Sequence, residues 1–286
     1  MRMTTAMFKR SAATVGLMSL LWILSTLMIP NHSHAAIFFD VDFETCAVGT
    51  GNDFPCEGWN DFNREFPGFL EMTTERAFSG TKSVKGTFTN INGGVRTPSI
   101  WRSFTPVSSM FTRFATRQSV GFQTGSNGAT KMVRFKDDVG YPVVMVSYVW
   151  GRYAISVEGP YDHNGSYVLY SSIVPSQTSW DQVEMEWTLN TPGQANGLVR
   201  LWVNGVLRIE NMNRQYIGPT PTSRGPHGLL NPSTLLIRTG QVYIQSGLGV
   251  LYYDRIAVGD TRIGLATSQP SSDTTPPITP AGVQVQ

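Results

Sequence analysis

Short apolar segments with a period of two residues, separated by turn-forming residues, occupy most of the sequence, and no segment carries a long helical repeat. The clearest is residues 183–189, VEMEWTL, in which the odd positions are apolar and the even positions polar. Residues 198–203, LVRLWV, follow a loop, and Asn204 and Gly205 then predict a tight turn into residues 206–210. This stretch predicts a meander of three antiparallel strands.

Nine further segments rich in Val, Ile, Phe, Tyr and Thr are predicted as strands. They are residues 37–43, 82–88, 111–117, 132–136, 143–149, 153–158, 167–171, 242–245 and 251–258. So many short strands without helices predict an all-β fold, a two-sheet antiparallel β-sandwich. A closed barrel is the alternative, but the turn spacing is too irregular to favour it. No repeat of 20–50 residues indicates a propeller or solenoid.

The N-terminus has the three parts of an export signal. Arg2, Lys9 and Arg10 precede an apolar run, residues 15–29, and Ser33 and Ala35 are the small residues of a cleavage site. We therefore expect a signal peptide, residues 1–35, cleaved after Ala35, and a protein that is secreted, periplasmic or held at the cell surface. The apolar run is shorter than the roughly 20 residues that span a bilayer. An uncleaved anchor is the alternative; no membrane span is expected in the mature chain.

Loss of this segment removes the positive net charge. The chain has 22 Lys and Arg against 20 Asp and Glu. Taking away Arg2, Lys9 and Arg10 leaves 22 less three, or 19, against the same 20 acids. The basic character therefore belongs to the export segment, and it does not indicate a nucleic-acid partner.

The mature chain contains two cysteines, Cys46 and Cys56, ten residues apart. In an oxidising compartment such a pair predicts one local disulfide. Zinc is less favoured, because His163 and His227 do not lie near the cysteines with the spacing of zinc ligands.

The composition changes near the C-terminus. We expect one β-sandwich domain over residues 36–265. Residues 266–286 are rich in Pro, Ser and Thr and predict a disordered tail or linker. Such a tail is compatible with a monomer or with one part of a modular surface protein.

Several segments resemble a known group of proteins. Residues 180–186 (WDQVEME), 189–193 (LNTPG) and 197–205 (GLVRLWVNG) look like a hallmark of concanavalin A-like jelly rolls, closest to polysaccharide lyases of the alginate- and glucuronan-lyase type. Residues 78–84 (FSGTKSV) and 252–258 (YYDRIAV) resemble other strands of such sandwiches and of carbohydrate-binding modules. The resemblance implies a concanavalin A-like jelly roll with a polysaccharide partner.

A lyase of this type needs particular chemistry. Elimination across a uronic acid requires a cation or amide to neutralise the carboxylate, a base to take the neighbouring proton, and an acid to protonate the leaving oxygen. The resemblance implies Lys131, Arg134, Tyr148 and Arg152 on the concave sheet for these roles. The alternative is that these side chains only contact ligand, or are ordinary polar residues of strand faces.

Aromatic and basic side chains supply candidate ligand contacts. We expect Trp150, Tyr167, Arg200 and Trp202 to contact sugar, because flat aromatic faces suit pyranose rings. Burial in the core is the alternative for the aromatic members.

Two acidic residues, Glu184 and Glu186, raise the alternative of a glycoside hydrolase. An ion pair with Arg200 on the neighbouring strand explains them more simply. Trp59 and Trp187 are assigned to the core.

Three acids predict a structural calcium site. Asp42 and Glu44 are assigned to the first strand and Asp254 to the last, so they would meet if the terminal strands pair. No organic cofactor is expected.

The sequence thus predicts a secreted module that binds a polysaccharide on its concave sheet. One alternative is a polysaccharide lyase that cleaves a uronate-containing polymer by β-elimination. A second is a non-catalytic structural or adhesive module of the cell surface.

Overall fold

A computed structural model provides the structure of the chain. It describes residues 36–50, 56–62, 70–88, 99–105, 107–123, 129–137, 142–157, 167–191, 193–215, 232–238 and 249–267. The chain divides into two units, Met1–His34 and Ala35–Gln286, and all of these residues lie in the second. They are strands and connections, and they include no helix that could span a membrane.

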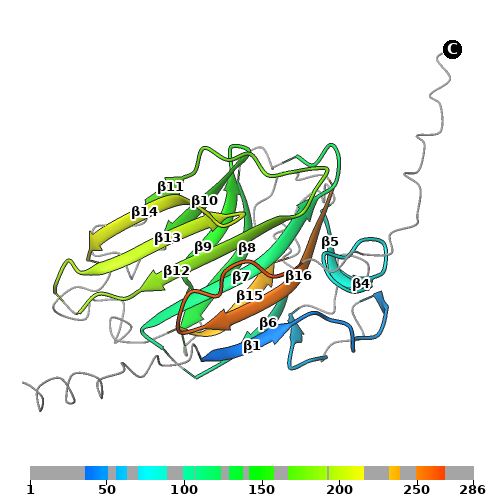
Figure 1. The fold of residues 1–286 in the computed structure, drawn as a ribbon, viewed down its shortest axis with the longest axis horizontal. Coiled ribbons are helices and arrows are strands. Elements are labelled where there is room, and N and C mark those ends of the chain that lie inside the picture. The colour runs from blue at the N-terminus through cyan, green and yellow to red at the C-terminus, as the bar shows by residue number, and fades with distance from the viewer. Residues whose placement is uncertain are drawn as a thin grey trace, which may run out of the picture. The chain divides into compact units, whose positions relative to one another are not determined.

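The larger sheet has nine antiparallel strands (Figure 1). In spatial order they are β14 (Val206–Arg214), β13 (Gly197–Val203), β12 (Asp181–Thr188), β7 (Ser109–Gln118), β16 (Gly249–Gly259), β5 (Ser83–Phe88), β4 (Leu70–Thr73) and β2 (Gly49–Thr50), with β1 (Ile37–Val41) paired to the second half of β16. The predicted meander is confirmed as β12, β13 and β14, and Asn204 and Gly205 form its tight turn with φ of 52° and 78°.

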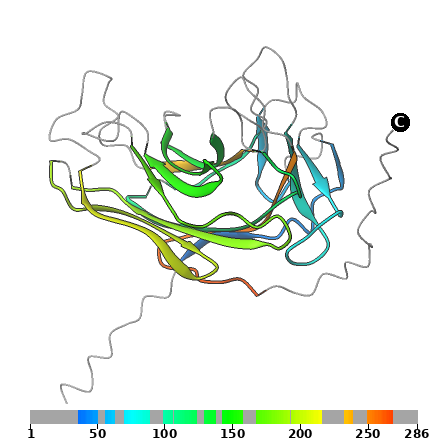
Figure 2. The same cartoon turned by 90° about the horizontal axis from the view of Figure 1, so that it is seen from above.

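The smaller sheet has seven antiparallel strands. Their order is β11 (Tyr167–Tyr170), β10 (Arg152–Val157), β9 (Pro142–Val149), β8 (Ala129–Asp137), β15 (Pro232–Arg238), β6 (Ser99–Ser103) and β3 (Asn60–Phe62). Figure 2 shows the two sheets as stacked layers. The larger sheet bends upward at both ends, and the smaller one lies on the inner side of that bend. The fold is therefore the expected two-sheet antiparallel β-sandwich.

The core lies between the two sheets and is built from their alternating apolar positions. Val183, Met185 and Trp187 of β12 are buried, as the period of two predicts, and they join one cluster with Tyr148 and Tyr153 of the other sheet. Trp59 and Trp187 are both fully buried, which confirms their assignment to the core. Burial of large apolar side chains is the main source of stability for such a sandwich.

Most predicted strands are present, with ends that differ by a few residues. Strands β2, β3, β4, β6 and β15 were not predicted. The predicted strand at residues 242–245 falls outside the described residues.

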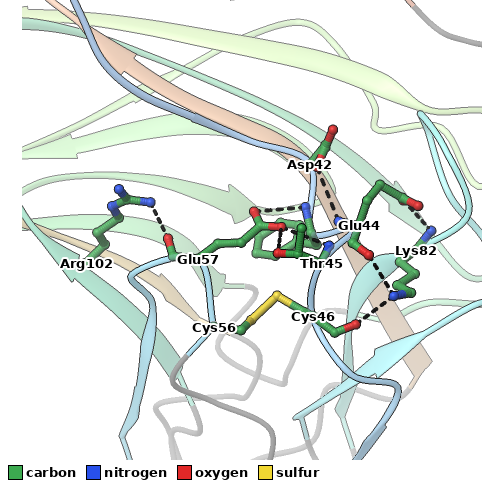
Figure 3. Close-up of a disulfide and its surroundings, with 9 residues drawn as sticks. Asp42, Glu44, Thr45, Cys46, Cys56, Glu57, Lys82 and Arg102 are labelled. Carbon is green, nitrogen blue, oxygen red and sulfur yellow. Dashed lines mark hydrogen bonds between the residues drawn. A yellow bond between two sulfur atoms is a disulfide. The ribbon is translucent and has the colours of Figure 1, made fainter.

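The predicted disulfide is present. Cys46 and Cys56 are bonded, with their Cα atoms 5.5 Å apart. Beside it, Lys82 Nζ donates to the carbonyl oxygens of Glu44 at 2.7 Å and Cys46 at 2.8 Å (Figure 3). Glu57 accepts from the backbone N–H of Thr45 at 3.1 Å. The disulfide and these bonds fix the chain where it leaves β1.

Candidate functional site

Basic side chains from one strand gather on the outer face of the seven-stranded sheet. Lys131, Arg134 and Lys136 of β8 are partly exposed, while Met132 and Val133 both belong to the core. A register shift between β8 and β9 at this point explains why Lys131 and Arg134, three residues apart, share a face. We call the outer face of this sheet, with these three residues at its centre, the basic face.

A row of paired residues crosses the basic face from β8 to β11. Lys131 pairs with Ser147, Ser147 with Ala154, and Ala154 with Tyr170. Tyr170 is 50% exposed, whereas Ser147 and Ala154 are small and buried. Within the described part of the chain, the buried Ser147 hydroxyl has no hydrogen-bond partner. The row therefore places a cation and an exposed phenol on either side of two small residues.

Acidic side chains are missing from the part of this face that the structure describes. Its outward-facing members are Ser99, Trp101, Ser103, Lys131, Arg134, Lys136, Met145, Ser147, Val149, Ala154, Ser156, Val168 and Tyr170. Three cations gathered on one strand favour contact with anions.

Tyr148 lies on the opposite side of its strand from the basic face. It is fully buried, and its hydroxyl donates to the hydroxyl of Tyr153 at 3.3 Å. Tyr153 in turn donates to Asp181 at 3.0 Å. Burial raises the pKa of the Tyr148 hydroxyl far above its ordinary value. Tyr148 therefore does not share a face with Lys131 and Arg134.

The tip of the β9–β10 hairpin carries two other predicted site residues. Trp150 is 66% exposed, and Arg152 is also exposed. The tip follows Val149, which pairs with Ala129 two residues before Lys131. Tyr167 begins β11, but its side chain is outside the described part of the structure. Trp150 and Arg152 are thus at one end of the basic face.

Arg200 and Trp202 lie on the other sheet. Both belong to β13 of the nine-stranded sheet and face outward from it. Arg200 forms ion pairs with Glu186 at 3.1 Å and Glu210 at 2.7 Å. Trp202 is only 8% exposed, because the guanidinium of Arg262 lies over its ring at 4.7 Å from the centroid. The predicted site residues therefore divide between two opposite faces.

Residues 260–267, which we call the strap, cross the outer face of the nine-stranded sheet after β16 (Figures 1 and 2). Glu184 is buried and accepts from the backbone N–H groups of Ile263 at 2.7 Å and Gly264 at 3.2 Å. Gln182 exchanges two hydrogen bonds with Ala266. Of the two predicted ion pairs of Arg200, the one with Glu186 is present, whereas Glu184 holds the strap.

The three acids of the predicted calcium site have other partners. The terminal strands do pair, as expected. Asp254, however, accepts from the N–H groups of Phe78 at 2.7 Å and Ser79 at 3.0 Å, and Glu44 accepts from those of Thr81 and Lys82, both at 2.8 Å.

The Asp42 carboxylate accepts from the N–H of Glu44 and pairs with Arg255 at 3.5 Å. No group of three His, Cys, Asp or Glu side chains within the described ranges could hold a metal ion. In this arrangement the three carboxylates are engaged with other groups and do not form a calcium site. Calcium binding by the protein stays a prediction.

Sequence reasoning missed two members of the basic face, Lys136 and Ser147. The alternation of β8 could have identified Lys136, because it lies two residues beyond Arg134. Ser147 carries no such sign, since its place beside Lys131 depends on the pairing of β8 with β9.

Solved structures share this fold. The endo-β-1,4-glucuronan lyase from the fungus Trichoderma reesei superposes with a TM-score of 0.54 at 16% identity, over 75% of this chain and 95% of that one. The PL-14 alginate lyase from Aplysia kurodai gives 0.55 at 8% identity, over 78% and 99%. The cellulose induced protein Cip1 gives 0.51 at 16% identity, over 80% and 100%.

The sequence itself matches no protein-family model and no curated protein. At identities of 8–16%, likeness to solved structures establishes the fold alone. The chain is a concanavalin A-like β-sandwich that resembles polysaccharide lyases.

Proposed function

We propose that the protein binds an acidic polysaccharide, a uronate-containing polymer, on its basic face. The observation that carries this proposal is the set of three basic side chains, Lys131, Arg134 and Lys136, that β8 presents together on one outer face. A uronate polymer carries one carboxylate per acidic sugar, and repeated cations along a strand suit repeated anions along a chain.

A hydrogen bond to a charged group contributes about 1.5–3 kcal/mol. Three such bonds would therefore contribute several kcal/mol to the free energy of binding a polymer. Neutral glycans carry no negative charge to pair with these three cations, so we expect them to bind more weakly.

Elimination is the second candidate function, and Tyr170 is the observation that favours it. Tyr170 is exposed and shares a row with Lys131, three strands away, or roughly 14 Å between Cα atoms. A ring lying over Ser147 would have Lys131 on one side and Tyr170 on the other. Two of the proteins with a similar fold are a glucuronan lyase and an alginate lyase.

Binding nevertheless stands first, because a base must come within hydrogen-bond reach of the proton beside the carboxylate. Strands β9 and β15 flank β8 and place no tyrosine on the basic face, since Tyr148 faces the core. A structural or adhesive role at the cell surface is the remaining alternative, and it predicts no glycan binding at all.

The test compares the purified protein on polyuronate and neutral glycans. Affinity gel electrophoresis measures binding at several salt concentrations, with calcium and with a chelator, while ultraviolet absorbance follows unsaturated uronates. We expect retardation by polyuronates that weakens with salt, and no rise in absorbance. A rise that is lost in Tyr170→Phe would make the protein a lyase. Absence of retardation on every glycan would overturn the proposal.

A further inference from the structure

Two hairpins of the sandwich have two-residue turns of the same backbone geometry. In the β13–β14 hairpin the turn is Asn204 and Gly205, with φ of 52° and 78°. In the β9–β10 hairpin it is Trp150 and Gly151, with φ of 52° and 72°. Positive φ at both positions favours Asn followed by Gly, and it disfavours a bulky side chain such as Trp. The backbone therefore gives no reason for Trp150.

Packing gives no reason either. Trp150 is 66% exposed, whereas Trp59 and Trp187 are fully buried. It has no hydrogen-bond or ring partner in the described ranges, and the same holds for hydrogen bonds and ion pairs of Arg152.

Asn204 in the matching turn is tied into the fold. Its side chain donates to Asp181 at 2.9 Å and accepts from the N–H of Gln182 at 2.8 Å. A strained, exposed tryptophan without such contacts is the kind of outlier that indicates a functional contact.

We propose that the β9–β10 tip is a sugar-binding subsite, in which Trp150 stacks on the apolar face of a pyranose ring and Arg152 pairs with the carboxylate of a uronate. This inference rests on the proposed function, because it extends the polymer site of the basic face beyond Lys131. Beside Trp150, Val149 is almost buried, Gly151 has no side chain and the exposed Arg152 is charged, so the tip is not the broad apolar patch that a protein partner would need. One flat ring beside one cation matches a single acidic sugar.

The variant Trp150→Asn separates function from folding. It gives the turn its favoured Asn-Gly sequence, so we expect its unfolding midpoint to be higher than that of the wild type. Loss of the stacked ring should lower the affinity for polyuronate about three- to tenfold in the same gel assay. Trp150→Tyr should retain most of that affinity. Arg152→Gln should weaken binding of polyuronate and leave any binding of neutral glycan unchanged.

Trp202→Phe is the matched control, since it removes a tryptophan from the opposite face and should bind as the wild type does. If the wild type binds polyuronate and Trp150→Asn binds it equally well, the subsite is refuted while the proposed function stands. A lower unfolding midpoint of Trp150→Asn would show that Trp150 stabilises the fold, and this too would overturn the inference. Absence of glycan binding by the wild type would refute both.

Discussion

The two outer faces of the sandwich differ in the charged side chains that they present. On the nine-stranded face, basic residues lie within ion-pair distance of acids of the same face. The basic members are Lys85, Arg113, Arg200, Arg255 and Arg262, and their partners are Asp40, Asp42, Glu71, Glu75, Glu184, Glu186 and Glu210. On the basic face, β8 presents three cations close together, Lys131, Arg134 and Lys136.

The nine-stranded face is also partly covered by other segments of the chain. The nine-stranded face lies under the strap and under residues 74–82, the cover loop between β4 and β5. Phe78 of the cover loop and Ala266 of the strap pack in one cluster with Ala115 of β7. Charges that neutralise each other leave little attraction for a ligand. We therefore expect changes on the nine-stranded face to alter stability, and changes on the basic face to alter binding.

The largest expected effect on stability comes from Asp254, which anchors the cover loop. Asp254→Ala would leave the buried N–H groups of Phe78 and Ser79 without an acceptor. We expect a loss of about 3 kcal/mol in the free energy of unfolding at about pH 5, measured by denaturant titration. Polyuronate binding should be unchanged. A variant of wild-type stability would contradict the anchoring role.

The same residue predicts a dependence on pH. Burial raises the pKa of Asp254 to about 7 against the opposing N–H donors, and the charge of Glu44 adds to the rise. The ordinary value is 3.8, so between these values the folded protein holds a proton that the unfolded chain has released. This contribution to stability is complete below about pH 4 and is lost as the pH rises through about 7.

The stability difference between wild type and Asp254→Ala should therefore narrow by roughly 2–3 kcal/mol between about pH 5 and pH 8. Denaturant titrations across this range test it. A difference that stays constant or widens would show that the pKa of Asp254 is not raised.

A smaller effect is expected at Glu184, which holds the strap. Glu184→Ala removes the acceptor of the Ile263 and Gly264 N–H groups, but the released strap can bind water instead. We expect a loss of about 1–2 kcal/mol and faster hydrogen exchange at these two amides. Glu186→Ala is the control, because Glu186 does not contact the strap through any of these bonds. Unchanged exchange in Glu184→Ala would refute the role of this carboxylate.

The smallest effect is expected at Arg200. Its ion pairs with Glu186 and Glu210 are partly exposed to solvent, and such pairs contribute about 1 kcal/mol or less. Arg200→Gln should therefore lower the unfolding free energy only slightly and leave polyuronate binding unchanged. A large loss of binding would place the ligand on the nine-stranded face and break the comparison.

Local patterns predicted strands well and faces less well. The meander of β12, β13 and β14 combines strict alternation with the Asn204-Gly205 turn, so its pairing could be predicted. Strand β15 begins with Pro232 and continues through three consecutive apolar residues, which gives no alternation to detect. Its place in the middle of the seven-stranded sheet depends on pairing with β6 and β8.

The candidate site was harder to predict than the fold. Ser147 and Tyr148 necessarily point to opposite sides of β9, and the tyrosine faces inward, where its hydroxyl donates to Tyr153 and its ring packs against Phe122. Trp202 does face outward, as its strand pattern indicates, but Arg262 covers it from a segment about 60 residues further along the chain. Such contacts between distant segments have no counterpart in local sequence.

The most direct test of the division between the two faces is to neutralise the basic face alone. We would measure polyuronate affinity and unfolding free energy for Lys131→Gln, Arg134→Gln and Lys136→Gln combined, beside Arg200→Gln. The account predicts that the triple variant loses about a hundredfold or more in affinity while its stability changes far less. Wild-type affinity in the triple variant would contradict it, because a ligand that ignores all three cations does not bind on the basic face.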